Sequence, residues 1–129
     1  MRNPVILDVN PDPEDLAWEQ DFLARLEIPV LSCCGPDTQG GCPLLRGERC
    51  RKIEKADGVL FQLNLDRGDH RRILGMYLRR LDVPIRVVAT PEQRVRWGGL
   101  LDLVEVFTPP IGPAKMDAFA AEVASETDD

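Results

Sequence analysis

Five short apolar runs, each separated from the next by a helix-length segment, constrain the fold of this chain most. They occupy residues 5–9, 29–33, 58–65, 84–90 and 103–107. The third run is almost continuously apolar, which is typical of a strand buried on both faces of a parallel sheet. Parallel strands need crossover connections, and these are right-handed. The sequence therefore predicts a three-layer α/β/α sandwich, (βα)5, with a five-stranded parallel sheet in the order 2-1-3-4-5.

The segments between the runs carry recognisable helix boundaries. Asp12 is a good N-cap, and Pro13 suits the first position of a helix that extends to about residue 27. Thr90-Pro91-Glu92-Gln93 predicts a capping box at the start of a short fourth helix, which Gly98-Gly99 weakens. The last helix follows Gly112-Pro113, and residues 125–129 are expected to be a frayed acidic tail. At 129 residues, positions 1–129 are predicted to form a single domain.

The start of the second helix is open between two positions. Pro43 favours a helix that runs from Leu44, whereas Gly47 favours a break and a start at Glu48. The difference matters for Cys50, because a helix from Glu48 would place this cysteine in its first turn. Gly47 therefore decides whether Cys50 can share a site with the cysteines before it.

The overall charge excludes two classes of partner. The net charge is −6 and the isoelectric point is near 4.8, which argues against non-specific binding of nucleic acid or of anionic membranes. No apolar run approaches the length of a transmembrane span, and the first residues lack the apolar region of a signal peptide. A cytoplasmic location is therefore expected, where thiols normally stay reduced.

The order of the predicted elements resembles that of the receiver domain of bacterial response regulators, and so do several residues at the ends of these elements. The similar segments are residues 5–7 with 12–14, 56–59, 87–90 and 108–109. The resemblance implies a signalling domain that takes a phosphoryl group from a histidine kinase onto an aspartate at the end of the third strand. Such a domain also needs an acidic pair for magnesium, a hydroxyl, and a lysine.

The chain departs from this pattern at the positions that carry the chemistry. Gln62 occupies the aspartate position, and an amide cannot form an acyl phosphate. Asn10 and Pro11 occupy the acidic pair, with only Asp12 beside them, and neutral groups are poor magnesium ligands. The lysine position holds Thr108.

Two positions keep some of the receiver character. Thr90 retains the hydroxyl, and Asp66 is the only carboxylate that a shifted register would bring to the phosphoacceptor place. The resemblance thus predicts a degenerate receiver that has lost phosphotransfer. We expect a non-catalytic signalling or protein-interaction domain whose partner is another protein. A homodimer through the fourth and fifth helices is a further option, using Val95, Trp97, Leu101, Met116 and Phe119.

Every cysteine of the chain lies in the loop at residues 33–50, at the end of the second apolar run. The spacing of Cys34, Cys42 and Cys50 matches neither a zinc ribbon nor a ferredoxin. Three interpretations stay open. Cys33 and Cys50 fill the core beneath the first and second helices; or Cys34, Cys42 and Cys50 bind zinc or an iron–sulfur cluster with His70; or a redox disulfide joins Cys34 to Cys42 or Cys42 to Cys50. A thiol-based redox or metal sensor is the alternative function.

Overall fold

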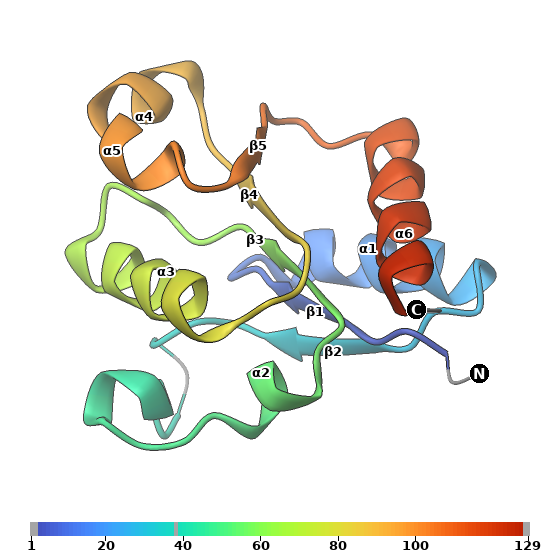
Figure 1. Cartoon of the computed structure of the whole chain (residues 1–129), viewed down its shortest axis with the longest axis horizontal. Coiled ribbons are helices and arrows are strands. Elements are labelled where there is room, and N and C mark those ends of the chain that lie inside the picture. The colour runs from blue at the N-terminus through green and yellow to red at the C-terminus, as the bar shows by residue number, and fades with distance from the viewer. Residues whose placement is uncertain (1–2, 38, 128–129) are drawn as a thin grey trace.

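A five-stranded parallel sheet forms the centre of the computed structural model, which describes residues 3–37 and 39–127 (Figure 1). Its strands are β1 (Ile6–Val9), β2 (Val30–Cys33), β3 (Gly58–Phe61), β4 (Ile85–Val88) and β5 (Glu105–Phe107). They lie in the order β2-β1-β3-β4-β5, and all neighbouring pairs are parallel. The predicted strand order is confirmed. The third strand is shorter than predicted, because the chain leaves the sheet at Gln62.

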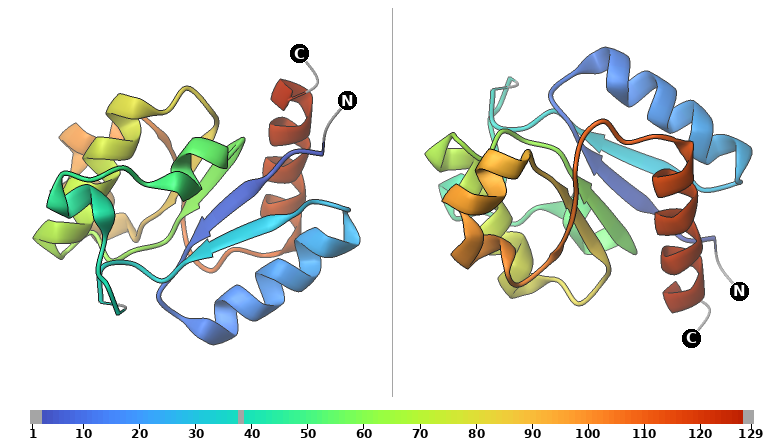
Figure 2. Two further views of the ribbon diagram at one scale, coloured as in Figure 1. Left: turned by 90° about the horizontal axis from the view of Figure 1, so that it is seen from below. Right: turned by 90° about the horizontal axis from the view of Figure 1, so that it is seen from above.

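Helices cover both faces of this sheet. They are α1 (Pro13–Arg25), α2 (Arg51–Lys55), α3 (Gly68–Arg80), α4 (Pro91–Arg96), α5 (Gly98–Leu101) and α6 (Pro113–Thr127), with a 3-10 helix, η1 (Pro43–Arg46). The two views in Figure 2 place α1 and α6 on one face and the other helices on the opposite face. The three-layer arrangement is therefore confirmed. The predicted capping box is also present, since Thr90 Oγ1 accepts from the Gln93 amide at 3.2 Å.

The two faces of the sheet bury separate apolar clusters. Ile6 and Leu60 point towards α1 and α6, whereas Val9 and Phe61 point towards α2 and α3, as the alternation of side chains along a strand requires. Gly58 at the start of β3 lies against α6 so closely that a Cβ atom there would be 2.4 Å from Val123 Cγ2. The face that carries α1 and α6 is therefore tightly packed.

Neither predicted start of the second helix is correct. Residues Pro43–Arg46 form the separate turn η1, Gly47 ends it with a left-handed φ of 76°, and α2 begins only at Arg51. Glycine adopts this conformation without the steric cost that other residues bear. Cys50 is consequently the N-cap residue of α2 and not a residue of its first turn.

Two further predictions need correction. Residues 125–127 are helical as the end of α6 and are not frayed, whereas residues 128–129 lie outside the described part of the chain. The expected dimer face is wrong for three of its five residues, because Met116, Phe119 and Leu101 are core residues. Val95 is 87% exposed, and Trp97 is half-buried. Among the described helices none has the length and apolar character that crossing a membrane requires.

Candidate functional site

Two carboxyl groups are buried side by side beneath α1, beside the carboxyl end of the sheet. Asp8 comes from the middle of β1 and Glu19 from the inner side of α1, and their exposed fractions are 0% and 2%. Within residues 3–37 and 39–127, neither forms an ion pair with a lysine or an arginine. Buried carboxylates without a cation are costly unless hydrogen bonds or a proton compensate for the lost water.

The side chain of Gln62 supplies most of the hydrogen bonds to the two carboxyl groups. Residue Gln62 follows β3 directly, and its backbone amide donates to the Val9 carbonyl at 2.7 Å. Its Nε2 lies 2.9 and 3.0 Å from the two carboxyl oxygens of Glu19 and 3.1 Å from Asp8 Oδ1. Asn10 adds a longer contact, with Nδ2 3.3 Å from Glu19 Oε1. Two neutral amides thus hold the pair.

The raised pKa of Asp8 indicates that this carboxyl group is neutral. Burial, followed by the hydrogen bond and the negative charge of Glu19, raises the pKa of Asp8 to about 9, and the hydrogen bond from Gln62 acts against this rise. Asp8 is therefore protonated at neutral pH. Its Oδ2 is buried and has no hydrogen-bond partner among the described residues.

The polar residues near this pair form hydrogen bonds within their own segments of the chain. Asn10 Oδ1 accepts from the Asp12 amide at 2.9 Å, and Asp12 Oδ1 accepts from the Glu14 amide at 3.0 Å, which caps α1 beyond the exposed Pro11. The Thr90 hydroxyl caps α4. The carbonyl of Thr108 accepts a hydrogen bond from Lys115 Nζ at 2.8 Å.

Asp66 takes no part in the hydrogen bonds of Gln62. Its side chain binds residues of α4 and Trp97, and so connects the loop after β3 to α4. Its Oδ1 accepts from Arg96 at 2.6 Å and from Trp97 Nε1 at 3.1 Å, and its Oδ2 accepts from Gln93 at 3.3 Å. The hydrogen bonds from Trp97, then Gln93 and Arg96, lower the pKa of the Asp66 carboxyl below its ordinary value. Asp66 therefore serves as an anchor for α4.

The cysteines surround a second site, a pocket of about 610 Å³ between β2, η1, α2 and α3. All four are free thiols, partly exposed, and all four line it. Cys33 packs against the cluster of α2 and α3 and not beneath α1 as one interpretation expected. Burial raises the pKa of this thiol. Cys50 also packs on that cluster, close to Tyr77.

His70 does not join the cysteines. Its ring is buried at the start of α3, where Nδ1 lies 2.9 Å from the Asn64 amide, and burial lowers its pKa. The described residues contain no group of three or more histidine, cysteine, aspartate or glutamate side chains arranged to hold a metal ion. The expected set of Cys34, Cys42, Cys50 and His70 is therefore not assembled.

Sequence reasoning missed both members of the carboxyl pair. A signal for each exists in hindsight: Asp8 interrupts an apolar strand, and Glu19 falls between Leu16 and Leu23 on the apolar side of α1. Charged residues are almost never fully buried unless paired, so either position marks a buried network. Only the fold shows that the two meet at Gln62.

The structure resembles solved receiver domains. A CheY-like receiver domain protein from Methanospirillum hungatei JF-1 has a TM-score of 0.71 and 13% identity, covering 99% of this chain and 100% of that one. A two-component response regulator from Clostridium difficile has a TM-score of 0.73 and 14% identity, covering 98% and 100%. An adenylate cyclase from Rhodopirellula baltica has a TM-score of 0.72 and 12% identity, covering 98% and 91%. No protein-family model and no curated protein sequence matches this chain. At these identities the likeness establishes the fold alone.

Proposed function

We propose that this chain is a receiver-like signalling domain that acts by binding another protein and does not accept a phosphoryl group. The observation that carries the proposal is the side chain of Gln62, which follows β3 and is hydrogen-bonded to Asp8 and Glu19. A carboxylate nucleophile is needed for an acyl phosphate, and an amide with its nitrogen committed to two acids supplies none.

Among the described residues, those around Gln62 form no group of carboxylates suited to a magnesium ion, which supports the proposal. Mg²⁺ prefers charged oxygen ligands in octahedral geometry together with several waters. Asp8 is buried and protonated, Glu19 is buried beside it, and Asp12 is used as a helix cap. We therefore assign signalling by this domain to the binding of another protein.

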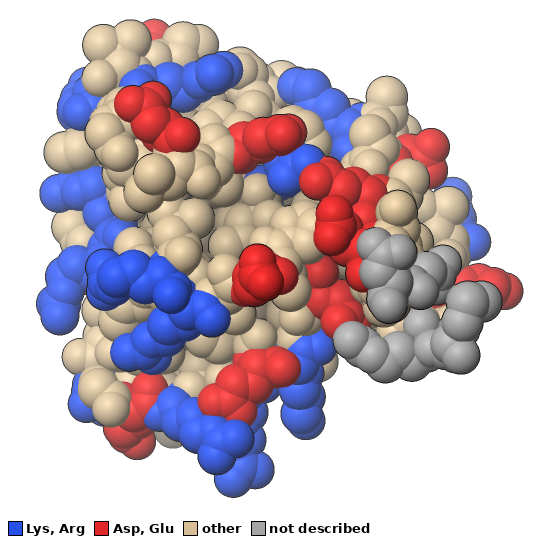
Figure 3. All heavy atoms as spheres, in the orientation of Figure 1, with Lys and Arg blue, Asp and Glu red and all other residues tan. Residues whose placement is uncertain are grey.

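The groove between α3 and α5 is the surface that we assign to the partner. It has a volume of about 660 Å³, and Arg71, Arg72 and Arg79 line it with Gly68, Gly75, Met76 and Leu100. Arg71 lies over the Trp97 ring at 3.7 Å, whereas Arg72 and Arg79 pair with no carboxylate of the described residues. Lys and Arg gather over α3 in Figure 3, although the chain is acidic overall. Such a groove suits an acidic segment of a protein partner.

A phosphorylation assay tests the loss of phosphotransfer. Incubating the protein with acetyl phosphate and Mg²⁺, followed by intact-mass analysis, is expected to leave the mass unchanged, while a functional receiver domain treated in parallel gains one phosphoryl group. Stoichiometric labelling at Asp66 or Asp12 would overturn this part of the proposal.

Charge reversal tests the docking surface. We expect the double substitution Arg72→Glu with Arg79→Glu to abolish binding of a fluorescent polyglutamate peptide at low salt, measured by anisotropy. Arg25→Glu with Arg94→Glu, which changes the net charge equally at two exposed arginines outside the groove, is the matched control and should reduce binding only slightly. Equal losses for the two proteins would mean that net charge alone attracts the peptide, and would remove the groove from the proposal.

A further inference from the structure

The pocket lined by the four cysteines shares no residue with the hydrogen-bond network of Gln62 or with the groove between α3 and α5. The proposed function gives this pocket no role. The pocket gathers all four cysteines of the chain, together with Tyr77 and the basic residues Arg46, Arg49, Arg51 and Lys52. We propose that Cys33 and Cys42 form a reversible intramolecular disulfide when the protein meets a peroxide. This inference is independent of the proposed partner and of phosphotransfer.

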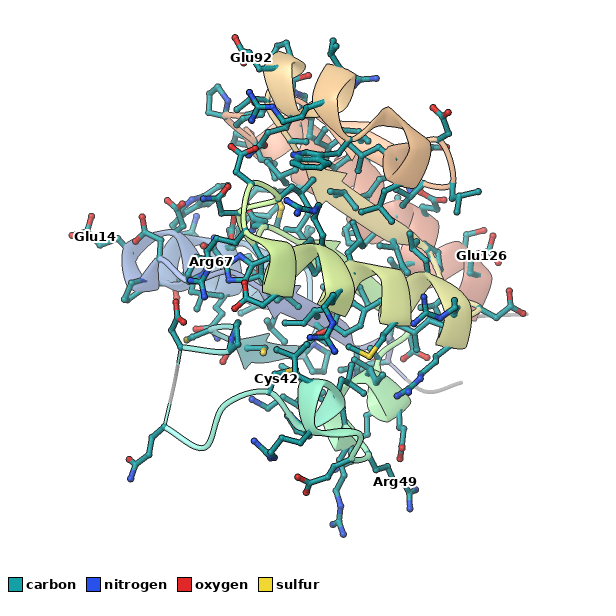
Figure 4. The ribbon with its side chains drawn as sticks, turned by 90° about the vertical axis from the view of Figure 1, so that its left-hand side faces the viewer. Glu14, Cys42, Arg49, Arg67, Glu92 and Glu126 are labelled. Carbon is teal, nitrogen blue, oxygen red and sulfur yellow. The ribbon has the colours of Figure 1, made fainter. Side chains whose placement is uncertain are left out.

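Three of the four thiols lie around the same buried ring. Cys33, Cys42 and Cys50 all pack on the cluster that includes Tyr77. The charges of these three thiolates act on the Tyr77 hydroxyl and contribute to its raised pKa, after burial. Figure 4 places Cys42 between the end of β2 and η1. The three side chains therefore line the same pocket and pack on the same apolar cluster.

Cys42 is the partner of Cys33 that the geometry favours. Cys42 and, more weakly, Cys50 act electrostatically on Cys33. Cys34, although adjacent in sequence, does not pack on the cluster that Cys33, Cys42 and Cys50 share. Successive side chains of an extended segment point in opposite directions, which accounts for its separation.

The connecting loop permits the two sulfur atoms to approach. Cys33 and Cys42 are nine positions apart, and closing so short a loop has a small entropic cost. Gly35, Gly40 and Gly41 have φ values of 91°, 90° and 66°, so the chain turns where only glycine does so freely. Arg46 donates to the Gly40 carbonyl, which holds the loop back towards η1. Both cysteines remain partly exposed, so a small oxidant reaches them.

The chemistry takes two steps. Burial disfavours the thiolate of Cys33, so Cys42 is the nucleophile: its thiolate attacks hydrogen peroxide, the O–O bond breaks, hydroxide leaves, and Cys42 becomes a sulfenic acid. The Cys33 sulfur then attacks the Cys42 sulfur, the S–O bond breaks, and water leaves with the thiol proton. Two thiols lose two electrons to one peroxide. Lys52, which lowers the pKa of Cys33, favours its deprotonation in this second step.

Peptide mapping of the oxidised wild-type protein tests the pairing without relying on a variant. After treatment with stoichiometric hydrogen peroxide and alkylation of the remaining thiols, we expect mass spectrometry to find a Cys33–Cys42 disulfide, with Cys34 and Cys50 alkylated. Dithiothreitol should restore four free thiols. A predominant disulfide between any other pair, or irreversible oxidation of single cysteines with no disulfide, would overturn the proposal.

Single substitutions provide a second test. Cys42→Ser should prevent peroxide from consuming two thiols per molecule, whereas Cys34→Ser, which alters a thiol of the same pocket outside the pair, should leave disulfide formation unchanged within twofold in rate. Far-ultraviolet circular dichroism checks that both variants fold. An equal effect of the two substitutions would contradict the assignment of Cys42.

Discussion

The Nε2 atom of Gln62 lies 2.9 and 3.0 Å from the two carboxyl oxygens of Glu19. The same nitrogen is 3.1 Å from Asp8, so one neutral amide ties the end of β3 to β1 and to α1. In this protein the residue after β3 therefore has a structural role: its side chain donates hydrogen bonds to two buried carboxyl groups. That role explains why glutamine suits the position and why a third carboxylate would not.

Removal of this amide is the first test. We expect Gln62→Leu to lower the free energy of unfolding by about 1–3 kcal/mol, because Asp8 and Glu19 lose a buried donor. Urea denaturation measures the change. Gln39→Leu, in the exposed part of the cysteine loop, is the control and should have little effect. If the two variants are equally stable, Gln62 does not support the pair.

The buried proton predicts an unusual dependence of stability on pH. The pKa of Asp8 is about 9 in the folded protein and near 3.8 when the chain is unfolded, so folding takes up a proton between these values. This group stabilises the fold fully below pH 4, and its contribution falls by up to about 1.4 kcal/mol per pH unit as the pH rises towards 9. Denaturation from pH 5 to pH 9 measures the slope.

The variant Asp8→Asn isolates that contribution. Asparagine needs no proton to be neutral, so the decline in stability with rising pH should become markedly shallower in this variant. Asp82→Asn, at an exposed position after α3, should keep the wild-type slope. A wild-type slope in Asp8→Asn would show that another group is responsible.

Asp66 is expected to anchor α4. In Asp66→Ala the side chains of Arg96 and Trp97 lose their common acceptor, so residues 91–96 should exchange their amide hydrogens faster than in the wild type. Hydrogen exchange with mass spectrometry measures this change. Asp82→Ala is the control, and unchanged exchange of α4 in Asp66→Ala would refute the anchoring role.

The contact between β3 and α6 gives a further prediction. Gly58→Ala should destabilise the protein by about 1–3 kcal/mol, because its Cβ would lie 2.4 Å from Val123 Cγ2. Gly99→Ala should be tolerated, because a Cβ atom added at Gly99 would meet no other part of the protein within 4 Å. Val123→Ala should relieve much of the cost, so the double variant should lose less stability than the sum of the single ones. Strict additivity would contradict this contact.

Local patterns in the sequence were enough to predict the sheet and the starts of the first, fourth and last helices. The apolar runs must be buried on both faces, and this requirement leads to a parallel sheet with helices on both sides. Asp12 with Pro13 and Thr90 with Gln93 form caps through neighbouring residues only, so their geometry follows from their order in the chain. The broken second helix was partly foreseen, since Gly47 does interrupt it.

The tertiary structure decided which side chains meet. Asp8, Glu19 and Gln62 come from three elements, and only the pairing of β1 with β3 beneath α1 brings them to hydrogen-bonding distance. The loop after β2 likewise brings Cys42 to the pocket that Cys33 lines, while the Asn64 backbone amide binds His70 outside this pocket. The sequence by itself determined the fold, because burial of apolar runs is a local and repeated requirement. It did not determine the sites, because these depend on long-range register and on where each chain segment leaves the sheet.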